Sequence, residues 1–185
     1  FLSYCGRWLY PEALAAFEHA RDESAPLPCA QANLTCTVTC NERGVLSLYS
    51  DCTEWAGTPE ALTLRRADTW NLETGYPITA SECFPRGTRV RALCLTAARE
   101  QCRRQQESSL AVYHPDFSRR LRRNLNLRNF YLSEKGFHFF YQPWAIAPGF
   151  EGCPTFLLPF SDSETDAAGP LWPAGNPCNA EKSIV

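Results

Sequence analysis

Apolar and polar residues alternate along the stretch 129–160 in a way that predicts an aromatic β-hairpin. The apolar positions recur at two-residue spacing, which places them on one face of each strand: Phe130 and Leu132 in the first strand, and Phe137, Phe139 and Tyr141 in the second. Residues 133–136 between the strands read Ser-Glu-Lys-Gly, which suits a type I turn closed by Gly136 in the left-handed conformation. A loop rich in proline and glycine follows, and then a third short apolar strand that ends near Phe160.

The first half of the chain predicts further strands. Residues 34–40 alternate strictly, and a three-residue loop ending at Gly44 leads into a second strand. This loop would set Cys40 opposite Leu46, so that the apolar residues of both strands share one face. Residues 61–72 predict a third strand.

Helical periodicity predicts two main helices, over 88–105 and 117–125, and a short helix over 10–21. The helix over 88–105 carries one apolar stripe: Val90, Leu93, Cys94, Ala97, Ala98 and Cys102. The predicted fold is therefore α+β, an antiparallel sheet with the two main helices packed on one face.

Length and composition set the domain organisation. The 185 residues, 44% hydrophobic, suffice for one domain with a sizeable core. We expect an N-terminal helix and loop over 1–33, part of a small preceding subdomain, then a main domain over 34–160, and a tail over 161–185 rich in proline, glycine and aspartate. No segment reaches the roughly 18 consecutive apolar residues of a membrane span.

Ten cysteines predict a disulfide-rich domain made outside the reducing cytosol. They are scattered along the whole chain: Cys5, Cys29, Cys36, Cys40, Cys52, Cys83, Cys94, Cys102, Cys153 and Cys178. The alternative is a cytosolic protein whose buried thiols act as small hydrophobic groups. Because the chain has no Cys-x-x-Cys pair and its three histidines are isolated, we expect neither a metal nor another cofactor.

A series of blocks in the second half resembles a known family. The blocks are Asn129-Phe130-Tyr131-Leu132-Ser133, Gly136, Tyr141-Gln142-Pro143-Trp144, Ile146-Ala147-Pro148, Gly152 and Leu158-Pro159-Phe160. In this order and spacing they resemble the C-terminal domain of unknown function shared by RsiV-type (lysozyme-sensing) anti-sigma factors and PdaC-type peptidoglycan deacetylases. Upstream blocks at 44–51, 54–57 and 68–75 extend the resemblance, which covers roughly 34–160.

One upstream block departs from the family. Where the family tends to carry Gly-Gly-Ala-His, residues 56–59 read Ala-Gly-Thr-Pro. The corner histidine is missing, so any role that it has in the family does not carry over to this chain.

The resemblance implies an extracytoplasmic module of a bacterial envelope or secreted protein, either secreted or anchored through a segment before Phe1. The implied function is non-catalytic binding or sensing. The implied partner is a lysozyme-like protein, another envelope protein or a cell-wall glycan, and no nucleic acid.

The residues most suited to binding are the aromatic and apolar side chains in and after the second hairpin strand: Tyr141, Trp144, Ile146 and Phe150. Large aromatic side chains on a rigid loop are common anchors of protein and sugar recognition. The alternative is that they cover the edge of the core.

An arginine run predicts a second surface feature. Residues 119–123 read Arg-Arg-Leu-Arg-Arg, and no acid occurs between Asp116 and Glu134. The run indicates either a docking patch for an anionic partner or a solvated helix face that complements the acidic residues of the tail. We favour the solvated face, because nothing else in the chain is basic or carries a recognition motif.

We predict no enzyme activity, because the chain has no Gly-x-Ser-x-Gly, His-Glu-x-x-His or phosphate-binding glycine motif. His138 is interpreted as a partly buried sheet residue, and His114-Pro115-Asp116 as a turn with Asp116 at the start of the next helix. The alternative is a cell-wall glycan or peptide hydrolase whose carboxylates, such as Asp51, Glu54 and Asp68, are brought together by the fold.

Overall fold

The computed structural model describes residues 31–55 and 61–160, together with six single positions between residues 7 and 18, which are all helical. The described elements, in chain order, are β1 (Gln31–Glu42), β2 (Val45–Trp55), β3 (Leu62–Asn71), the 3₁₀ turn η1 (Ala80–Cys83), α2 (Val90–Glu107), α3 (Phe117–Asn124), β4 (Phe130–Ser133), β5 (Gly136–Phe140), the 3₁₀ turn η2 (Gly149–Glu151) and β6 (Thr155–Pro159). The predicted strands and both main helices are thus confirmed, and most of their ends lie within two residues of the predicted ones. A helix of the length and apolarity needed to cross a membrane does not occur among these residues.

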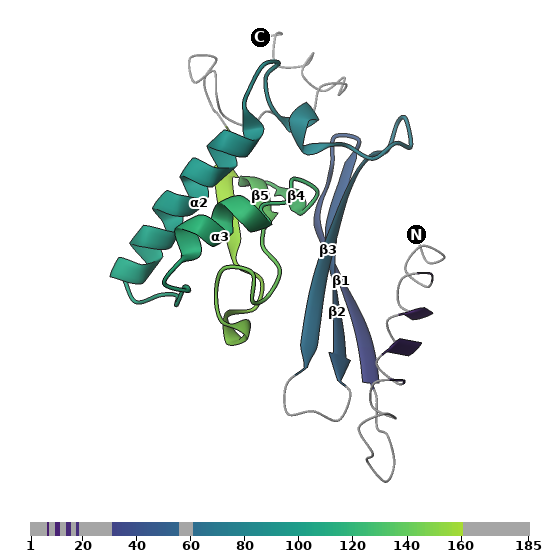
Figure 1. The fold of residues 1–185 in the computed structure, drawn as a ribbon. Coiled ribbons are helices and arrows are strands. Elements are labelled where there is room, and N and C mark those ends of the chain that lie inside the picture. The colour runs from purple at the N-terminus through teal and green to yellow at the C-terminus, as the bar shows by residue number, and fades with distance from the viewer. Residues whose placement is uncertain are drawn as a thin grey trace. The chain divides into compact units, whose positions relative to one another are not determined.

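The strands form two antiparallel sheets, with strand orders β1-β2-β3 and β4-β5-β6 (Figure 1). The prediction of mixed α and β structure with antiparallel strands is confirmed, but the prediction of one sheet is wrong. Sequence patterns identify strands and neighbouring hairpins, whereas the partner of an outer strand is decided by distant residues.

The first hairpin has a loop of two residues, Arg43 and Gly44, and not the three that were predicted. Both have positive φ angles, 51° and 71°, as in the primed turns that match the twist of paired strands. The shorter loop shifts the register by one residue, so Cys40 does not lie opposite Leu46. Cys40 is buried as predicted, but Val38, two residues earlier in β1, is 56% exposed and not packed on the inner face.

The chain divides into two compact units, one comprising 1–37 and 50–66 and the other 38–49 and 67–185. In the first unit, the guanidinium group of Arg65 donates two hydrogen bonds to the carboxylate of Asp51, at 2.7 and 2.8 Å. The hydroxyl groups of Thr53 and Thr63 lie 3.2 Å apart in the same unit. The predicted main domain over 34–160 stays a prediction.

The second unit contains the predicted aromatic hairpin. Phe130 pairs with Phe139 and Ser133 with Gly136, so only residues 134 and 135 form the loop. Gly136 has a φ of +140°, and a Cβ atom there would collide with the carbonyl oxygen of Leu158 in the neighbouring strand. Glycine is therefore required both by the backbone conformation and by the close approach of β6.

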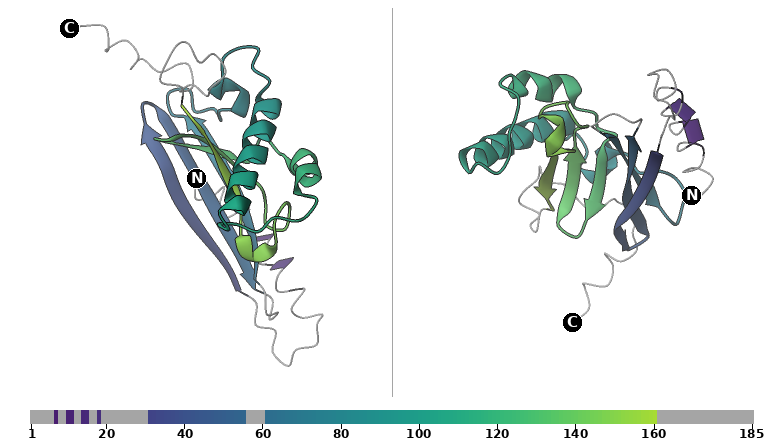
Figure 2. Two further views of the ribbon diagram at one scale, coloured as in Figure 1. Left: turned by 90° about the vertical axis from the view of Figure 1, so that its left-hand side faces the viewer. Right: turned by 90° about the horizontal axis from the view of Figure 1, so that it is seen from below.

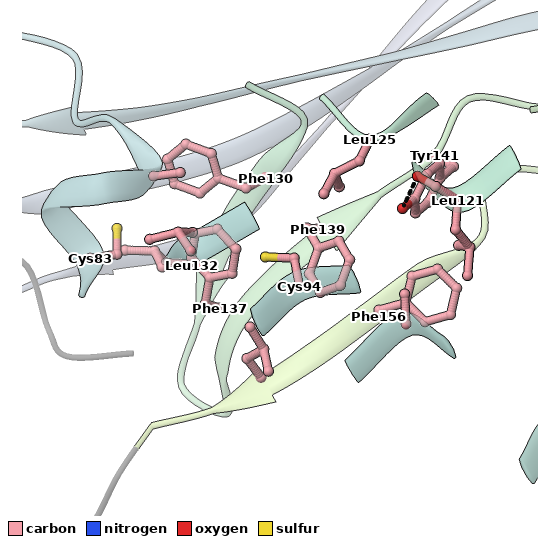
Figure 3. Packing of buried hydrophobic residues seen from close by; sticks show 14 of the residues in the cluster. Cys83, Cys94, Leu121, Leu125, Phe130, Leu132, Phe137, Phe139, Tyr141 and Phe156 are labelled. Carbon is pink, nitrogen blue, oxygen red and sulfur yellow. Dashed lines mark hydrogen bonds between the residues drawn. The ribbon is translucent and has the colours of Figure 1, made fainter. Parts of the chain in front are cut away.

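Helices α2 and α3 pack against one another, and α2 packs on β6, so that they cover one face of the β4-β5-β6 sheet (Figure 2). The buried side chains of that face and of the helices form the core of the unit (Figure 3): Phe130, Leu132, Phe137, Phe139, Phe156 and Leu158 from the sheet, and Val90, Cys94, Ala98, Cys102 and Leu121 from the helices. The predicted apolar stripe of α2 is thus confirmed as the face that packs on the sheet.

The prediction of a disulfide-rich fold is wrong for the five described cysteines that carry free thiols: Cys36, Cys40, Cys83, Cys94 and Cys102. Cys83, Cys94 and Cys102 are fully buried in the core, where they pack as small hydrophobic groups. Cys52 is buried in the first unit, and Cys153 is half-buried after β5. Cys5, Cys29 and Cys178 lie outside the described residues.

Candidate binding surface

The loop between β5 and β6, residues 141–154, is closed at its base and is called the aromatic loop below. The backbone N–H of Tyr141 donates to the carbonyl of Pro154 at 3.0 Å, which joins the two ends of the loop. A turn at its start is closed by the N–H of Ala145 and the carbonyl of Gln142 at 3.2 Å. Short-range closure of this kind lowers the conformational entropy that binding must remove.

Helix α3 and the segment before it hold the middle of the aromatic loop. The side-chain amide of Asn124 donates to the carbonyl of Ala145 at 2.7 Å. The backbone N–H of His114 donates to the carbonyl of Ile146 at 3.0 Å. The loop is therefore fixed to the helical layer on one side and to the sheet at its base.

Two of the four predicted binding residues belong to the core. Tyr141 and Ile146 are fully buried. The hydroxyl group of Tyr141 donates to the carbonyl of Leu121 at 3.1 Å, and burial raises the pKa of the tyrosine above its ordinary value (Figure 3). These two side chains anchor the loop from below and do not reach a partner at the surface.

The other two predicted residues, Trp144 and Phe150, are exposed by 51% and 78% of their surface. Trp144 has a φ of 66°, which is uncommon for a residue other than glycine. Its indole ring lies against Gly149, where a Cβ atom would overlap the ring. The exposed indole is thus held in place by the backbone of its own loop.

Two further apolar residues near the loop were not predicted. Leu110 and Val112 are 76% and 53% exposed, in the segment between α2 and α3. The backbone N–H of Val112 donates to the Glu151 carboxylate at 2.8 Å, which ties this segment to the residue after Phe150. The pattern Leu-Ala-Val after a Ser-Ser turn was the available signal, but it has no periodicity that indicates exposure.

The predicted arginine run lies on α3. The guanidinium group of Arg120 pairs with Asp116 at 2.7 Å, and this hydrogen bond lowers the pKa of the Asp116 carboxyl group. Asp116 lies at the N-cap position of α3, where it was predicted, but its side chain makes no capping hydrogen bond to the helix backbone. The acidic tail that was expected to complement the run lies outside the described residues.

His138 is half-buried in β5, in agreement with the prediction. Its Nε2 atom lies 2.7 Å from the hydroxyl group of Ser133, and its ring stacks on Tyr131 with centroids 4.7 Å apart. Burial lowers the pKa of His138, and the nearby charge of Lys135 adds to this.

The carboxylates proposed for a hydrolase are distributed between the two units. Asp51, which is ion-paired with Arg65, and Glu54 belong to the first unit, and Asp68 belongs to the second. In the part of the chain described above, no three His, Cys, Asp or Glu side chains are grouped so as to hold a metal ion.

Residues 84–161 match the model of a family described as a protein of unknown function (DUF3298). The fold is similar to the crystal structure of a DUF3298 family protein from Pseudomonas aeruginosa PAO1, with 16% identity, a TM-score of 0.56, and coverage of 79% of this chain and 65% of that chain. It is also similar to a DUF3298 family member from Bacteroides fragilis NCTC 9343, with 14% identity, a TM-score of 0.60, and coverage of 98% and 69%. This chain therefore spans slightly less than two thirds of the Pseudomonas protein. Among curated proteins, no match was found.

Proposed function

We propose that this chain is a non-catalytic, extracytoplasmic binding or sensing module of a bacterial envelope or secreted protein. It recognises a protein partner through the aromatic loop. The observation that carries this proposal is the exposure of Trp144 and Phe150 on a loop whose backbone is fixed by hydrogen bonds.

A fixed loop with two exposed aromatic rings has the physical properties of an interface anchor. Tryptophan and other large aromatic side chains contribute much of the binding free energy of protein interfaces. Because Gly149 and the buried Ile146 already hold the loop and the indole of Trp144, little conformational entropy remains to be lost on binding. Leu110 and Val112 extend the exposed apolar surface beside Phe150.

The resemblance to the C-terminal domain of RsiV-type and PdaC-type proteins names the first partner to test, a lysozyme-like or other envelope protein. It also supports the extracytoplasmic location. The solved structures of similar fold come from bacteria, in agreement with a bacterial module.

Binding to lysozymes and to solubilised peptidoglycan, measured by isothermal titration calorimetry, tests the proposal. Replacing Trp144 or Phe150 by Ala is expected to weaken binding by about tenfold or more, as for interface anchors. Tyr76→Ala is the matched control, because Tyr76 is 73% exposed in the same unit and lies outside the aromatic loop. Each variant is checked for an unchanged melting temperature.

A third variant tests whether binding depends on the position of the Trp144 indole and not only on its presence. Gly149→Ala keeps both aromatic residues but displaces the indole, and it is expected to weaken binding as well. Absence of binding at high micromolar concentration to every lysozyme and to peptidoglycan would contradict the proposal. Equal affinities of the loop variants and Tyr76→Ala would exclude the aromatic loop as the binding site.

A further inference from the structure

Positive charge is concentrated on one segment of the chain. Residues 89–128, which include α2 and α3, contain ten arginines and three acids, a formal charge of +7 in a chain whose total is −2. The remaining residues therefore carry a formal charge of −9. This separation creates a local positive potential that the net charge of the chain conceals.

Some of these arginines stabilise the helices. Arg91 donates to the carbonyls of Arg122 and Leu125 at 2.7 and 3.0 Å, and so joins the start of α2 to the end of α3. Arg120 is paired with Asp116. Arg91 and Arg120 therefore have structural roles, and their guanidinium groups are already occupied by partners within the protein.

Other guanidinium groups on the same helices have no partner in the described ranges 31–55 and 61–160. These are Arg103 on α2 and Arg119, Arg122 and Arg123 on α3, all exposed. Arginine is suited to bind carboxylates through two parallel hydrogen bonds. Four unpaired arginines on two adjacent helices are therefore available to an anionic partner.

The helices also provide shallow hollows between these side chains. A hollow of about 360 Å³ on α3 is lined by Asp116, Arg119, Arg120, Arg123 and Asn124. A second, of about 400 Å³ on α2, is lined by Thr96, Arg99, Glu100, Arg103, Arg104 and Glu107. Each hollow combines guanidinium groups with neutral polar side chains.

We propose that the arginine surface of α3, defined by Arg119, Arg122 and Arg123, which share one face of the helix at i, i+3 and i+4, binds an acidic polypeptide segment. Charge complementarity is the argument for an anionic partner. The acids in the hollows decide the class of anion: Asp116 lies in the α3 hollow, and Glu100 and Glu107 lie in the α2 hollow. Their carboxylate oxygens are hydrogen-bond acceptors, which the backbone N–H groups of an acidic polypeptide satisfy and which a phosphate polymer, having no N–H donors, leaves unpaired.

This surface is distinct from the aromatic loop, and the inference does not depend on the proposed function. Poly-L-glutamate is a suitable probe, since it has the proposed chemistry and no aromatic side chain. Binding is followed at low ionic strength by the NMR signals of the arginine Nε–Hε groups and by calorimetry. We expect the signals of Arg119, Arg122 and Arg123 to shift and the binding to weaken as salt is added.

Two charge reversals supply matched variants. Arg123→Glu is expected to weaken the binding of poly-L-glutamate by about fivefold or more, because it replaces an attraction by a repulsion within the surface. Lys135→Glu changes the net charge equally but lies in the hairpin turn between β4 and β5, so we expect less than about a twofold effect. The direct NMR shifts of the unmodified protein keep the test valid if Arg123→Glu folds poorly.

Three results would overturn the inference. They are absence of binding at low ionic strength, equal effects of the two charge reversals, and tighter binding of inorganic polyphosphate than of poly-L-glutamate. Trp144→Ala is expected to leave poly-L-glutamate binding unchanged. Failure of lysozyme binding with retained poly-L-glutamate binding would contradict the proposed function alone, and the converse would contradict this inference alone.

Discussion

The side-chain amide of Gln101 hydrogen-bonds both backbone groups of Leu157. Its Nε2 atom donates to the Leu157 carbonyl at 2.9 Å, and its Oε1 atom accepts from the Leu157 N–H at 3.3 Å. Leu157 belongs to β6, an outer strand of the second sheet. Gln101 on α2 thus occupies the place that a further strand would take and protects this edge from pairing with another chain.

Replacing Gln101 by Ala is expected to destabilise the protein by about 1–3 kcal/mol, because both backbone groups of Leu157 lose a partner in a half-buried position. Urea unfolding measures the effect, and light scattering tests whether the open edge promotes association. Gln106→Ala is the control, since Gln106 is exposed on the same helix. Equal stabilities of the two variants would contradict the capping role.

The opposite edge of the same sheet is capped by Ser47 of β2. The hydroxyl group of Ser47 accepts a hydrogen bond from the N–H of Leu132 in β4 at 2.8 Å, and it shares a second hydrogen bond with the Thr69 hydroxyl, also at 2.8 Å. Ser47 and Thr69 are 0% and 3% exposed, so water does not replace these partners. Ser47→Ala is expected to cost about 1–3 kcal/mol through the unsatisfied N–H of Leu132.

A double-mutant cycle distinguishes this network from a general loss of packing. Thr69→Val keeps the shape of the side chain and removes one hydrogen bond, so it is expected to cost less than Ser47→Ala. If the hydroxyls act together, the double variant costs less than the sum of the single variants. Strict additivity in urea unfolding would show that the two residues contribute independently.

The second hairpin was predictable because its determinants are local. The two-residue spacing of its apolar side chains lies within twelve residues of sequence and appears in the structure as predicted. Gly136 does not close a bulge: it pairs with Ser133 as the first residue of β5. The predicted loop length of the first hairpin was wrong because Arg43 has a positive φ angle, which no local sequence rule indicates for an arginine. One residue of loop length then changed which side chains face each other.

The site was predictable only in part for a different reason. Trp144 and Tyr141 belong to the same aromatic run, and only the packing of α3 and the sheet decides that Tyr141 is buried and Trp144 is exposed. The segment of Leu110 and Val112 is joined to the loop by the hydrogen bond from the Val112 N–H to the Glu151 carboxylate. These two residues are 39 positions apart, and one sequence does not reveal such a contact.

The buried thiols are expected to resist alkylation in the folded protein. Burial raises the pKa of Cys83 and Cys94 to about 12 and that of Cys102 to about 11, and only the thiolate reacts. Cys36, which is exposed, is expected to react in the folded protein and serves as the internal control. Mass spectrometry after iodoacetamide treatment, with and without urea, measures this.

The same experiment without reductant tests the chemical state of these cysteines. Free thiols at Cys83, Cys94 and Cys102 become alkylated in urea alone. Protection that persists in urea and disappears only after reduction would show disulfides at these positions and contradict the structure.

His138 provides a prediction for the dependence of stability on pH. Its pKa in the folded protein is lowered from an ordinary value of 6.5 by burial, so the unfolded chain binds a proton more readily than the folded one. The stabilisation that the neutral form of His138 provides is therefore fully present above about pH 6.5. It falls as the pH decreases towards the lowered pKa and is constant below that pKa.

An NMR titration of the His138 ring measures the pKa directly. His138→Gln is expected to flatten the change in unfolding free energy below pH 6.5, while His114→Gln, used as the control, retains it. A His138 pKa at or above 6.5 would show that the stacked ring of Tyr131 and the Ser133 hydroxyl favour the charged imidazolium more than burial disfavours it.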